Sequence, residues 1–207
     1  MADAQRLMPK GEARRAAILA EARRALLNVG YSRVSLRRVA QALGISLGNL
    51  QYYFPTKHSL IAAVIVQETE RAAALLREIA WDPKAPERCI RDAVEALLRS
   101  YAGPAGRVYA IAEFLALDDP RYARLKAEGY GELRRYIGQL VAVMAPQLDA
   151  ARRAGLARVL IALIDGAALQ LQTTDGNTEA ENTQTGRVDA MIDDVARAMQ
   201  TLLESWE

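Results

Sequence analysis

Cysteine, histidine, aromatic residues and long apolar runs are all scarce in this chain of 207 residues. The single cysteine, Cys89, excludes an internal disulfide and a cysteine-cluster metal site. His58 is the only histidine, so it cannot belong to a histidine metal cluster. Aromatic residues make up 6 % of the chain, while Ala, Leu and Arg are plentiful, and this balance favours helices over a sheet sandwich.

The longest apolar run covers only residues 159–164, whereas a membrane-spanning helix needs roughly 18 such residues. The first residues lack the apolar stretch of a secretory signal peptide. We therefore expect a reduced, cytoplasmic protein with no membrane partner. The sequence also shows no nucleophile beside a base, no metal-ligand spacing and no glycine-rich phosphate loop. Hence we expect no enzyme, no catalytic residues, no metal site and no cofactor.

The formal net charge of +2 conceals a strong asymmetry along the chain. Residues 1–60 carry ten Lys or Arg against three Asp or Glu, while residues 61–207 carry seventeen against twenty-two. A compact basic segment joined to an acidic remainder indicates that the first part meets a polyanion. Charge alone does not distinguish this from an ordinary solvated surface, so the decision depends on the motifs within the basic segment.

Three helices are predicted in the basic segment. Apolar residues recur at helical spacing over residues 11–29, and Gly30 supplies the left-handed residue that commonly ends a helix. Ser35 and Ser46 are good N-caps for helices over 36–43 and 47–53, with Gly44 in the turn between them. Two short helices around a tight glycine turn are typical of a helix-turn-helix, whose second helix enters the major groove of DNA.

The start of that second helix carries side chains suited to base edges. Asn49 and Gln51 can each pair with adenine, Leu47 can contact a thymine methyl, and Gly48 permits close backbone approach. Ser46 caps the same helix.

Other residues are suited to phosphates. Arg37 and Arg38 oppose the dipole in the first turn of their helix, which favours a phosphate there over plain extension into water. Thr56 and Lys57 open the next helix and form a predicted phosphate clamp. We expect one hydroxyl of the pair Tyr52 and Tyr53 to reach a phosphate, while the other ring packs beneath the unit. The predicted DNA-binding residues are therefore Ser35, Arg37, Arg38, Ser46, Leu47, Gly48, Asn49, Gln51, Tyr52, Tyr53, Thr56 and Lys57.

The first predicted helix and residues 35–46 and 48–60, about 50 residues in all, resemble the TetR family of bacterial transcriptional regulators. The shared features are a capped helix, a glycine turn, a second capped helix, an aromatic pair and the run Phe54-Pro55-Thr56-Lys57 before a long helix. One departure is Gln51, where many members carry an aromatic residue, so we expect Tyr52 to make the phosphate contact usually found there.

The resemblance implies an all-α homodimer. It would have a three-helix helix-turn-helix DNA-binding domain over residues 1–58 and a larger helical ligand-binding and dimerisation domain over 59–207. Family members usually repress a promoter and release it when a small molecule enters the second domain. The implied partners are a palindromic double-stranded operator, a second copy of the chain and an unknown small-molecule effector.

Helical patterns continue over residues 56–80, 86–102, 105–117, 120–145, 149–173 and 187–206, with a polar loop over 174–186. The last two helices are apolar over more of their surface than an isolated pair needs, which predicts a four-helix bundle with a second copy. Asp165 lies amid these apolar residues, either as a functional carboxylate or as a cap or interface hydrogen-bonding group. The predicted interface residues are Leu160, Ile164, Ala168, Ile192, Val195 and Met199.

The middle helices carry the candidate effector pocket. Its predicted aromatic residues, which plain core packing would explain equally well, are Trp81, Tyr101, Tyr109, Phe114 and Tyr130. Glu113 and Arg107 are candidate polar anchors, and we assign Glu113 to the pocket.

The leading hypothesis is a homodimeric repressor that a small molecule releases from its operator. One alternative is a DNA-binding regulator that has no effector or that activates transcription. A non-regulatory helical carrier or enzyme is the other, and salt-dependent binding to duplex DNA separates it from both regulators.

Overall fold

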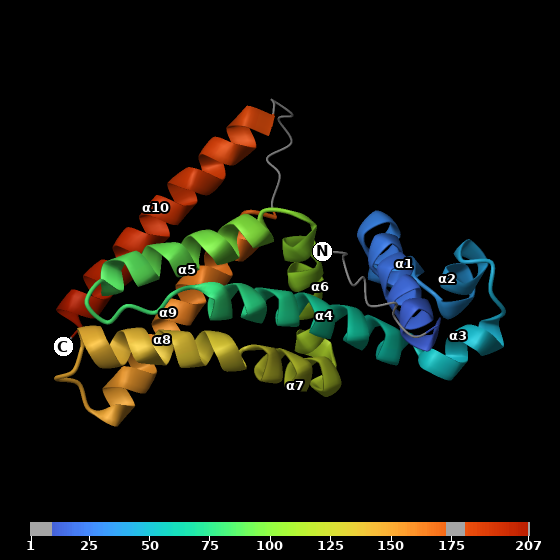
Figure 1. Cartoon of the computed structure of the whole chain (residues 1–207), viewed down its shortest axis with the longest axis horizontal. Coiled ribbons are helices and arrows are strands. Elements are labelled where there is room, and N and C mark those ends of the chain that lie inside the picture. Colours follow the sequence, from blue (N-terminus) through green and yellow to red (C-terminus); the bar gives the residue numbers. More distant parts are fainter. Residues whose placement is uncertain (1–9, 173–180, 207) are drawn as a thin grey trace, which may run out of the picture. The chain divides into compact units, whose positions relative to one another are not determined.

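The computed structural model describes residues 10–172 and 181–206, and within these ranges it contains ten α-helices and no strand. None of the described helices combines the length and the apolar character that crossing a membrane would need. The helices, in chain order, are α1 (Lys10–Arg33), α2 (Leu36–Ala42), α3 (Leu47–Tyr53), α4 (Lys57–Glu78), α5 (Pro86–Tyr101), α6 (Pro104–Asp118), α7 (Pro120–Gly129), α8 (Gly131–Met144), α9 (Ala150–Gln170) and α10 (Glu181–Ser205) (Figure 1).

The chain divides into two compact units, the first ending at Gln67 and the second beginning at Glu68. The division falls within α4, so residues 57–67 of this helix belong to the first unit and residues 68–78 to the second. In the first unit, α2 packs against both α1 and α3. Its core consists of aliphatic and aromatic side chains that are almost fully buried: Ile18, Leu19, Ala22, Leu26, Val34, Val39, Ala40, Leu50, Phe54, Leu60, Ile61, Val64 and Ile65.

Local sequence chemistry explains the short helices of the first unit. The hydroxyl of Ser35 accepts a hydrogen bond from the Arg38 amide at 3.3 Å, and that of Ser46 accepts one from the Asn49 amide at 3.1 Å. Each serine thus satisfies an amide that has no partner within its helix, as predicted. Gly44 has φ of 63°, a left-handed conformation that costs glycine little and permits the tight turn between α2 and α3.

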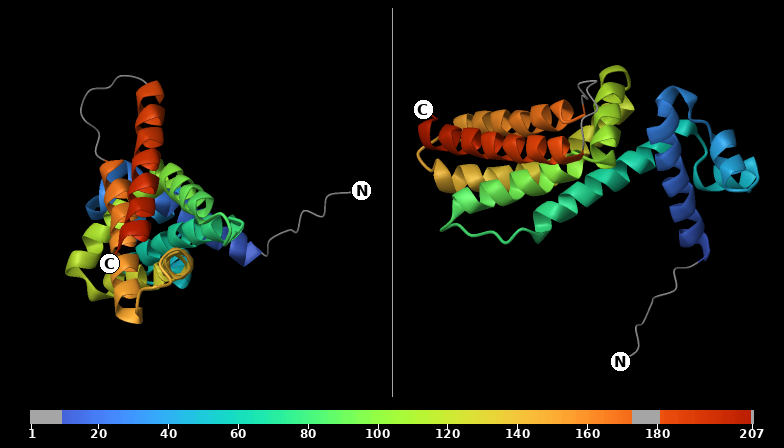
Figure 2. Two further views of the ribbon diagram at one scale, coloured as in Figure 1. Left: turned by 90° about the vertical axis from the view of Figure 1, so that its left-hand side faces the viewer. Right: turned by 90° about the horizontal axis from the view of Figure 1, so that it is seen from above.

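In the second unit α5, α8, α9 and α10 form a bundle, with α6 and α7 at one end of it (Figure 2). Helix α10 packs on α5 and α9, and α8 packs on α9. The core between these four helices is built mainly from Leu, Ile, Val and Ala. Two ion pairs of 2.8 Å also join α5 to α10, namely Arg91 with Asp193 and Arg99 with Asp189.

Three helix boundaries differ from the sequence expectation. The helix predicted over residues 11–29 continues to Arg33, with a kink at Gly30, whose φ is 75°. The single helix predicted over residues 120–145 is interrupted at Tyr130, which lies between two glycines that favour a helix end over a helix interior. The sequence predicts a polar loop over residues 174–186, whereas α10 begins at Glu181. Residues 174–180 of that segment lie outside the described residues.

Candidate nucleic-acid interface and cavity

Helix α3 presents a row of polar groups to solvent. Leu50 is fully buried and fixes the helix on the first unit, while Gly48, Asn49 and Gln51 are exposed. Tyr52 is 83 % exposed, which leaves its hydroxyl available for an external partner. The amide side chains of Asn49 and Gln51 can each offer a donor and an acceptor to a base edge, so this face of α3 is chemically equipped to read DNA.

The two tyrosines at the end of α3 differ in their surroundings. Their rings meet edge to face with centroids 5.2 Å apart, and Tyr53 is partly buried. Tyr52 is therefore the member of the pair with the more accessible hydroxyl.

The start of α2 carries two exposed arginines, Arg37 and Arg38. One Arg38 guanidinium nitrogen donates to the carbonyl of Arg33 at 3.3 Å. The first turn of α2 contains no acidic residue that would offset these charges locally. Cations at a helix N-terminus oppose its dipole, so an approaching phosphate would relieve this local repulsion.

The start of α4 is held by side chains on both sides. Thr56 and Ser59 cap each other, since the Ser59 amide donates to Thr56 Oγ1 at 3.0 Å and the Thr56 amide donates to Ser59 Oγ at 3.1 Å. The Lys57 ammonium donates to the carbonyls of Tyr31 at 2.5 Å and Ser32 at 3.4 Å. It also lies 4.1 Å from the centroid of the Tyr31 ring.

These contacts affect the role predicted for Lys57. Partial burial lowers the pKa of its ammonium, which the two carbonyls and the ring hold at the end of α1. In this structure the side chain therefore joins α1 to the start of α4. A phosphate would compete with those carbonyls for the ammonium, whereas the exposed Thr56 bonds to Ser59 of its own helix.

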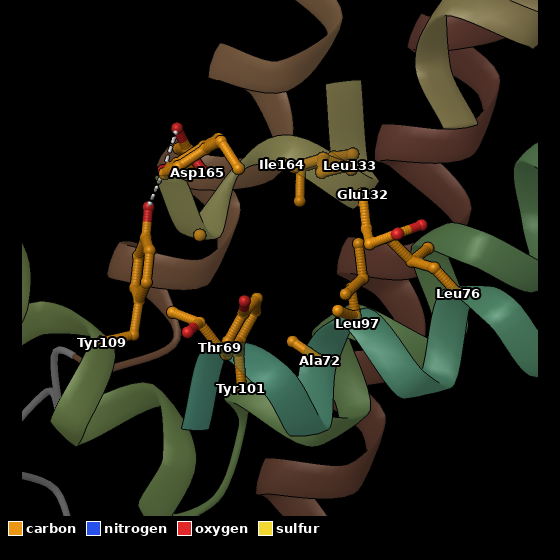
Figure 3. Close-up of a pocket in the computed structure, with 13 residues that line it drawn as sticks. Thr69, Ala72, Leu76, Leu97, Tyr101, Tyr109, Glu132, Leu133, Ile164 and Asp165 are labelled. Atoms are coloured by element: carbon orange, nitrogen blue, oxygen red, sulfur yellow. Dashed lines mark hydrogen bonds between the residues drawn. The ribbon is translucent and has the colours of Figure 1, made fainter. Parts of the chain in front are cut away.

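The second unit contains a cavity between α4, α5, α6, α8 and α9, partly open to solvent (Figure 3). It encloses about 460 Å³ of empty space, counting the part that is open. Most of its wall is aliphatic or aromatic. The lining residues are Thr69, Ala72, Ala73, Leu76, Leu97, Tyr101, Tyr109, Gly129, Tyr130, Glu132, Leu133, Ile164 and Asp165.

A hydrogen-bonded chain of three polar groups stands at one side of this cavity (Figure 3). The Tyr130 hydroxyl donates to the Asp165 carboxylate at 2.7 Å and lies 3.0 Å from the Tyr109 hydroxyl. Burial raises the pKa of Asp165 and of both tyrosines above their ordinary values. Burial, with a smaller contribution from the nearby carboxylates, also raises the pKa of Tyr101 to about 12.

Three of the six predicted pocket residues line this cavity, namely Tyr101, Tyr109 and Tyr130. The other three do not, and each has a physical reason. Trp81 is partly buried against the core and packs edge to face on Tyr136 at 5.8 Å between ring centroids. Phe114 is 64 % exposed on α6, and the Glu113 carboxylate is paired with Lys126.

The predicted dimer-interface residues are placed differently from the expectation. All six are at most 7 % exposed and belong to the core of the second unit: Leu160, Ile164, Ala168, Ile192, Val195 and Met199. A second copy cannot contact side chains that are already covered by their own chain, so any interface on α9 needs outward-facing residues. Ile164 additionally lines the cavity.

Asp165 and the α4 residues of the cavity wall were not assigned to the pocket from the sequence. A carboxylate within an apolar helix pointed to Asp165 without showing what it faces. Thr69, Ala72 and Leu76 recur along one face of α4, a pattern that core packing produces equally well.

In the part of the chain that the structure describes, His, Cys, Asp and Glu side chains do not gather in a group of three or more that could hold a metal. Cys89 is buried, and the amide of Asp82 lies 3.4 Å from its sulfur. The polar side chains of the cavity wall are those of Thr69, of three tyrosines and of two acidic residues, Glu132 and Asp165.

Comparison with known proteins agrees with this geometry. Residues 18–64 match the family model described as bacterial regulatory proteins, tetR family. The chain is 32 % identical over 94 residues to the HTH-type transcriptional regulator EthR of Mycolicibacterium smegmatis, covering 45 % of this chain and 43 % of that protein. It is 41 % identical over 63 residues to the HTH-type transcriptional repressor Rv1474c of Mycobacterium tuberculosis, covering 30 % of this chain and 34 % of that protein.

The matched segments thus span less than half the length of these curated relatives, which are named as regulators and not as enzymes. A similar solved structure is a transcriptional regulator from Saccharomonospora viridis in complex with choline, with a TM-score of 0.63 and 21 % identity. That likeness covers 95 % of this chain and 98 % of the other. Because the identity is only 21 %, this likeness shows a shared fold and nothing about the ligand of this chain.

Proposed function

Because the chain belongs to the TetR family of bacterial regulatory proteins and carries a helix-turn-helix domain at its N-terminus, we propose that it is a homodimeric transcriptional repressor released from its operator by a small molecule. The observation that carries the proposal is the exposed face of α3. There Asn49, Gln51 and Tyr52 point to solvent from a helix that Ser46 caps and Leu50 anchors. In the proposal, this face reads base edges, while Ser35, Arg37, Arg38, Thr56 and Lys57 position the phosphate backbone.

The cavity of the second unit supports a small-molecule effector. Apolar clefts with a few convergent polar groups are the usual form of small-ligand sites. Four of the lining residues belong to α4, the helix whose first eleven residues lie in the DNA-binding unit. A ligand that binds one placement of α4 more tightly would shift the population of conformers that fit the operator.

Two subunits are needed in this proposal because a palindromic operator presents two half-sites. Two α3 helices about 34–36 Å apart would enter successive major grooves on one side of the duplex. The name of the mycobacterial relative as a repressor favours repression over activation. A regulator that activates would share the same DNA contacts, and transcription from the identified promoter distinguishes the two.

The test is selection of bound duplexes from a random-sequence library by the full-length chain, followed by affinity measurements on the selected site and on random DNA at several salt concentrations. We expect a palindromic consensus and a steep loss of affinity with salt. The absence of any preferred sequence, or binding that salt does not weaken, would overturn the proposal.

A further inference from the structure

We propose that the cavity between α4, α5, α6, α8 and α9 binds a small organic cation, with the Asp165 carboxylate as its counter-ion. This inference rests on the proposed ligand-responsive function and names the chemical class of its effector. It starts from the uneven distribution of charge at the cavity wall. An apolar space with one unbalanced carboxylate favours a ligand that combines a hydrocarbon body with a positive charge.

Glu132 and Lys126 are each ion-paired with another charged side chain, and this sets them apart from Asp165. Glu132 is ion-paired with Arg135 at 2.8 Å. The Lys126 ammonium is paired with Glu113, so that its charge is already balanced there.

Asp165 itself has different neighbours. It accepts a hydrogen bond from the neutral Tyr130 hydroxyl, and across the described ranges 10–172 and 181–206 no Lys or Arg side chain is ion-paired with it. Arg134 and Lys126 line a second, more open hollow together with Tyr130 and Asp165, and the Arg134 guanidinium donates to the carbonyl of Ala127. The Lys126 charge acts on Asp165 through space, lowering its pKa by less than burial raises it, and the ammonium lies 5.6 Å from the centroid of the Tyr130 ring. The ion pair of Lys126, however, is with Glu113.

The cavity offers a cation more than this carboxylate. The Tyr101 and Tyr109 rings lie 5.0 Å apart between centroids, and Tyr130 completes a group of three rings at the polar side. Aromatic faces attract cations through their quadrupole, most strongly where water is excluded. Leu76, Leu97 and Leu133 provide an aliphatic wall for a hydrocarbon chain (Figure 3).

Burial makes the ionised form of Asp165 costly, and a bound cation would offset that cost. Burial raises the pKa of its carboxyl, since the ionised form has lost part of its hydration. A positive group beside the carboxylate offsets that loss. The same positive group would gain little from the neutral tyrosine hydroxyls alone.

The experiment measures binding of three probes that share one six-carbon chain to the full-length protein without DNA, by isothermal titration calorimetry. The probes are hexyltrimethylammonium, hexanoate and 1-hexanol. We expect the cation to bind roughly tenfold or more tightly than the alcohol, the range that a charged partner typically adds, and hexanoate to bind weakest. Asp165→Asn should reduce affinity for the cation to near that for the alcohol, while leaving alcohol binding unchanged.

Asp194→Asn makes the same substitution on the exposed surface of α10 and should leave all three affinities unchanged. Circular dichroism and the melting temperature report whether Asp165→Asn folds, and the ranking of the three probes tests the inference on the unaltered chain in any case. Equal or tighter binding of hexanoate or hexanol overturns the inference, as does a folded Asp165→Asn protein that keeps its preference for the cation. DNA binding measured without any probe tests the proposed function separately, so the two can fail independently.

Discussion

Asp165 is held by the tyrosine hydroxyls of the cavity, and its carboxyl titrates with a raised pKa because burial penalises the ionised form. The folded state therefore holds the Asp165 proton more tightly than the unfolded state does. The resulting stabilisation is fully present below the unfolded pKa near 3.8 and is lost as pH rises through the folded pKa. The titratable groups around this carboxyl include Tyr101, Tyr109, Tyr130, Glu113, Lys126 and Arg134.

We expect Asp165→Asn to remove this pH dependence. The free energy of unfolding of the variant, relative to the natural chain, should rise as pH increases from about 4 to 8, because only the natural chain must bury an ionising carboxyl. Urea denaturation at a series of pH values measures the difference. A difference that stays flat, or that falls with pH, would show that the ionised carboxylate is stabilised by its neighbours.

A second prediction at the residue scale separates the roles of Lys57 and Asn49. Asn49→Ala should mainly alter base preference at one position of the site, because this side chain is exposed on α3. Lys57→Ala should weaken binding to selected and random duplexes alike. It should also lower the free energy of unfolding by about 1 kcal/mol, since the ammonium donates to two carbonyls of the first unit.

The salt dependence of binding shows how Lys57 acts on DNA. If its ammonium leaves the two carbonyls for a phosphate, Lys57→Ala lowers the slope of log affinity against log salt by about one. An unchanged slope would mean that Lys57 acts by holding the start of α4. Equal losses on selected and random DNA for both variants would contradict the division between base and phosphate contacts.

At the scale of elements, the break between α7 and α8 shapes the cavity. Gly129, Tyr130 and Gly131 replace what the periodicity predicted as one continuous helix. The break places the Tyr130 hydroxyl within reach of Asp165 on α9. Gly129 also permits close approach to α4, since a Cβ there would lie 3.0 Å from the Thr69 methyl carbon.

The junction of α5 and α6 depends on another glycine. Gly106 is buried, and a methyl group at this position would overlap the carbonyl of Tyr101 and the side-chain amide of Gln172. We expect Gly106→Ala to lower the free energy of unfolding by about 1–3 kcal/mol, the range for overpacked sites. Thermal denaturation measures it.

Gly138→Ala in α8 is the matched control for this prediction. Among the described residues outside its own helical turn, nothing lies within 4 Å of a Cβ added at Gly138, so alanine should stabilise the helix by up to about 1 kcal/mol through its higher propensity. A loss of stability for both variants, or for neither, would refute the assignment of close packing at Gly106.

At the scale of the whole molecule, the proposed dimer needs a surface that the protomer does not bury. The outward side of α9 carries Val159 and Leu169, each 37 % exposed, with Ala162 and Gly166 between them at helical spacing. The interface residues predicted from the sequence lie elsewhere: those on α9 are on its opposite, buried side, and those on α10 are buried as well. We therefore propose that the two subunits meet through the outward side of α9.

We expect the double substitution Val159→Glu and Leu169→Glu to yield a monomer, because it places four carboxylates in a closed two-fold interface. Sedimentation velocity measures the oligomeric state. Affinity for a palindromic duplex should fall by at least roughly tenfold as the second half-site contact is lost. Phe114→Glu, on the exposed side of α6, is the control and should leave the dimer intact. Dissociation by Phe114→Glu alone would place the interface on α6 instead.

The sequence by itself determined the DNA-binding end of this protein. Ser35, Gly44 and Ser46 act through bonds or torsions within a few residues, so their roles follow from spacing alone, and the structure confirms both caps and the turn. Periodicity likewise indicated which segments are helical, because amphipathic spacing is a local property.

Only the tertiary structure decided which side of each apolar helix faces the core, the cavity or solvent. Ile164 and Asp165 are adjacent in the chain, and both line the cavity because residues from α4, α5, α6 and α8 meet α9 there. The break at Tyr130 and the placement of Lys57 on the carbonyls of Tyr31 and Ser32 depend on the same kind of non-local contact. When a helix is apolar on several sides, its sequence does not show which neighbouring helix covers each side. The cavity could therefore be identified only from the packing of the helices.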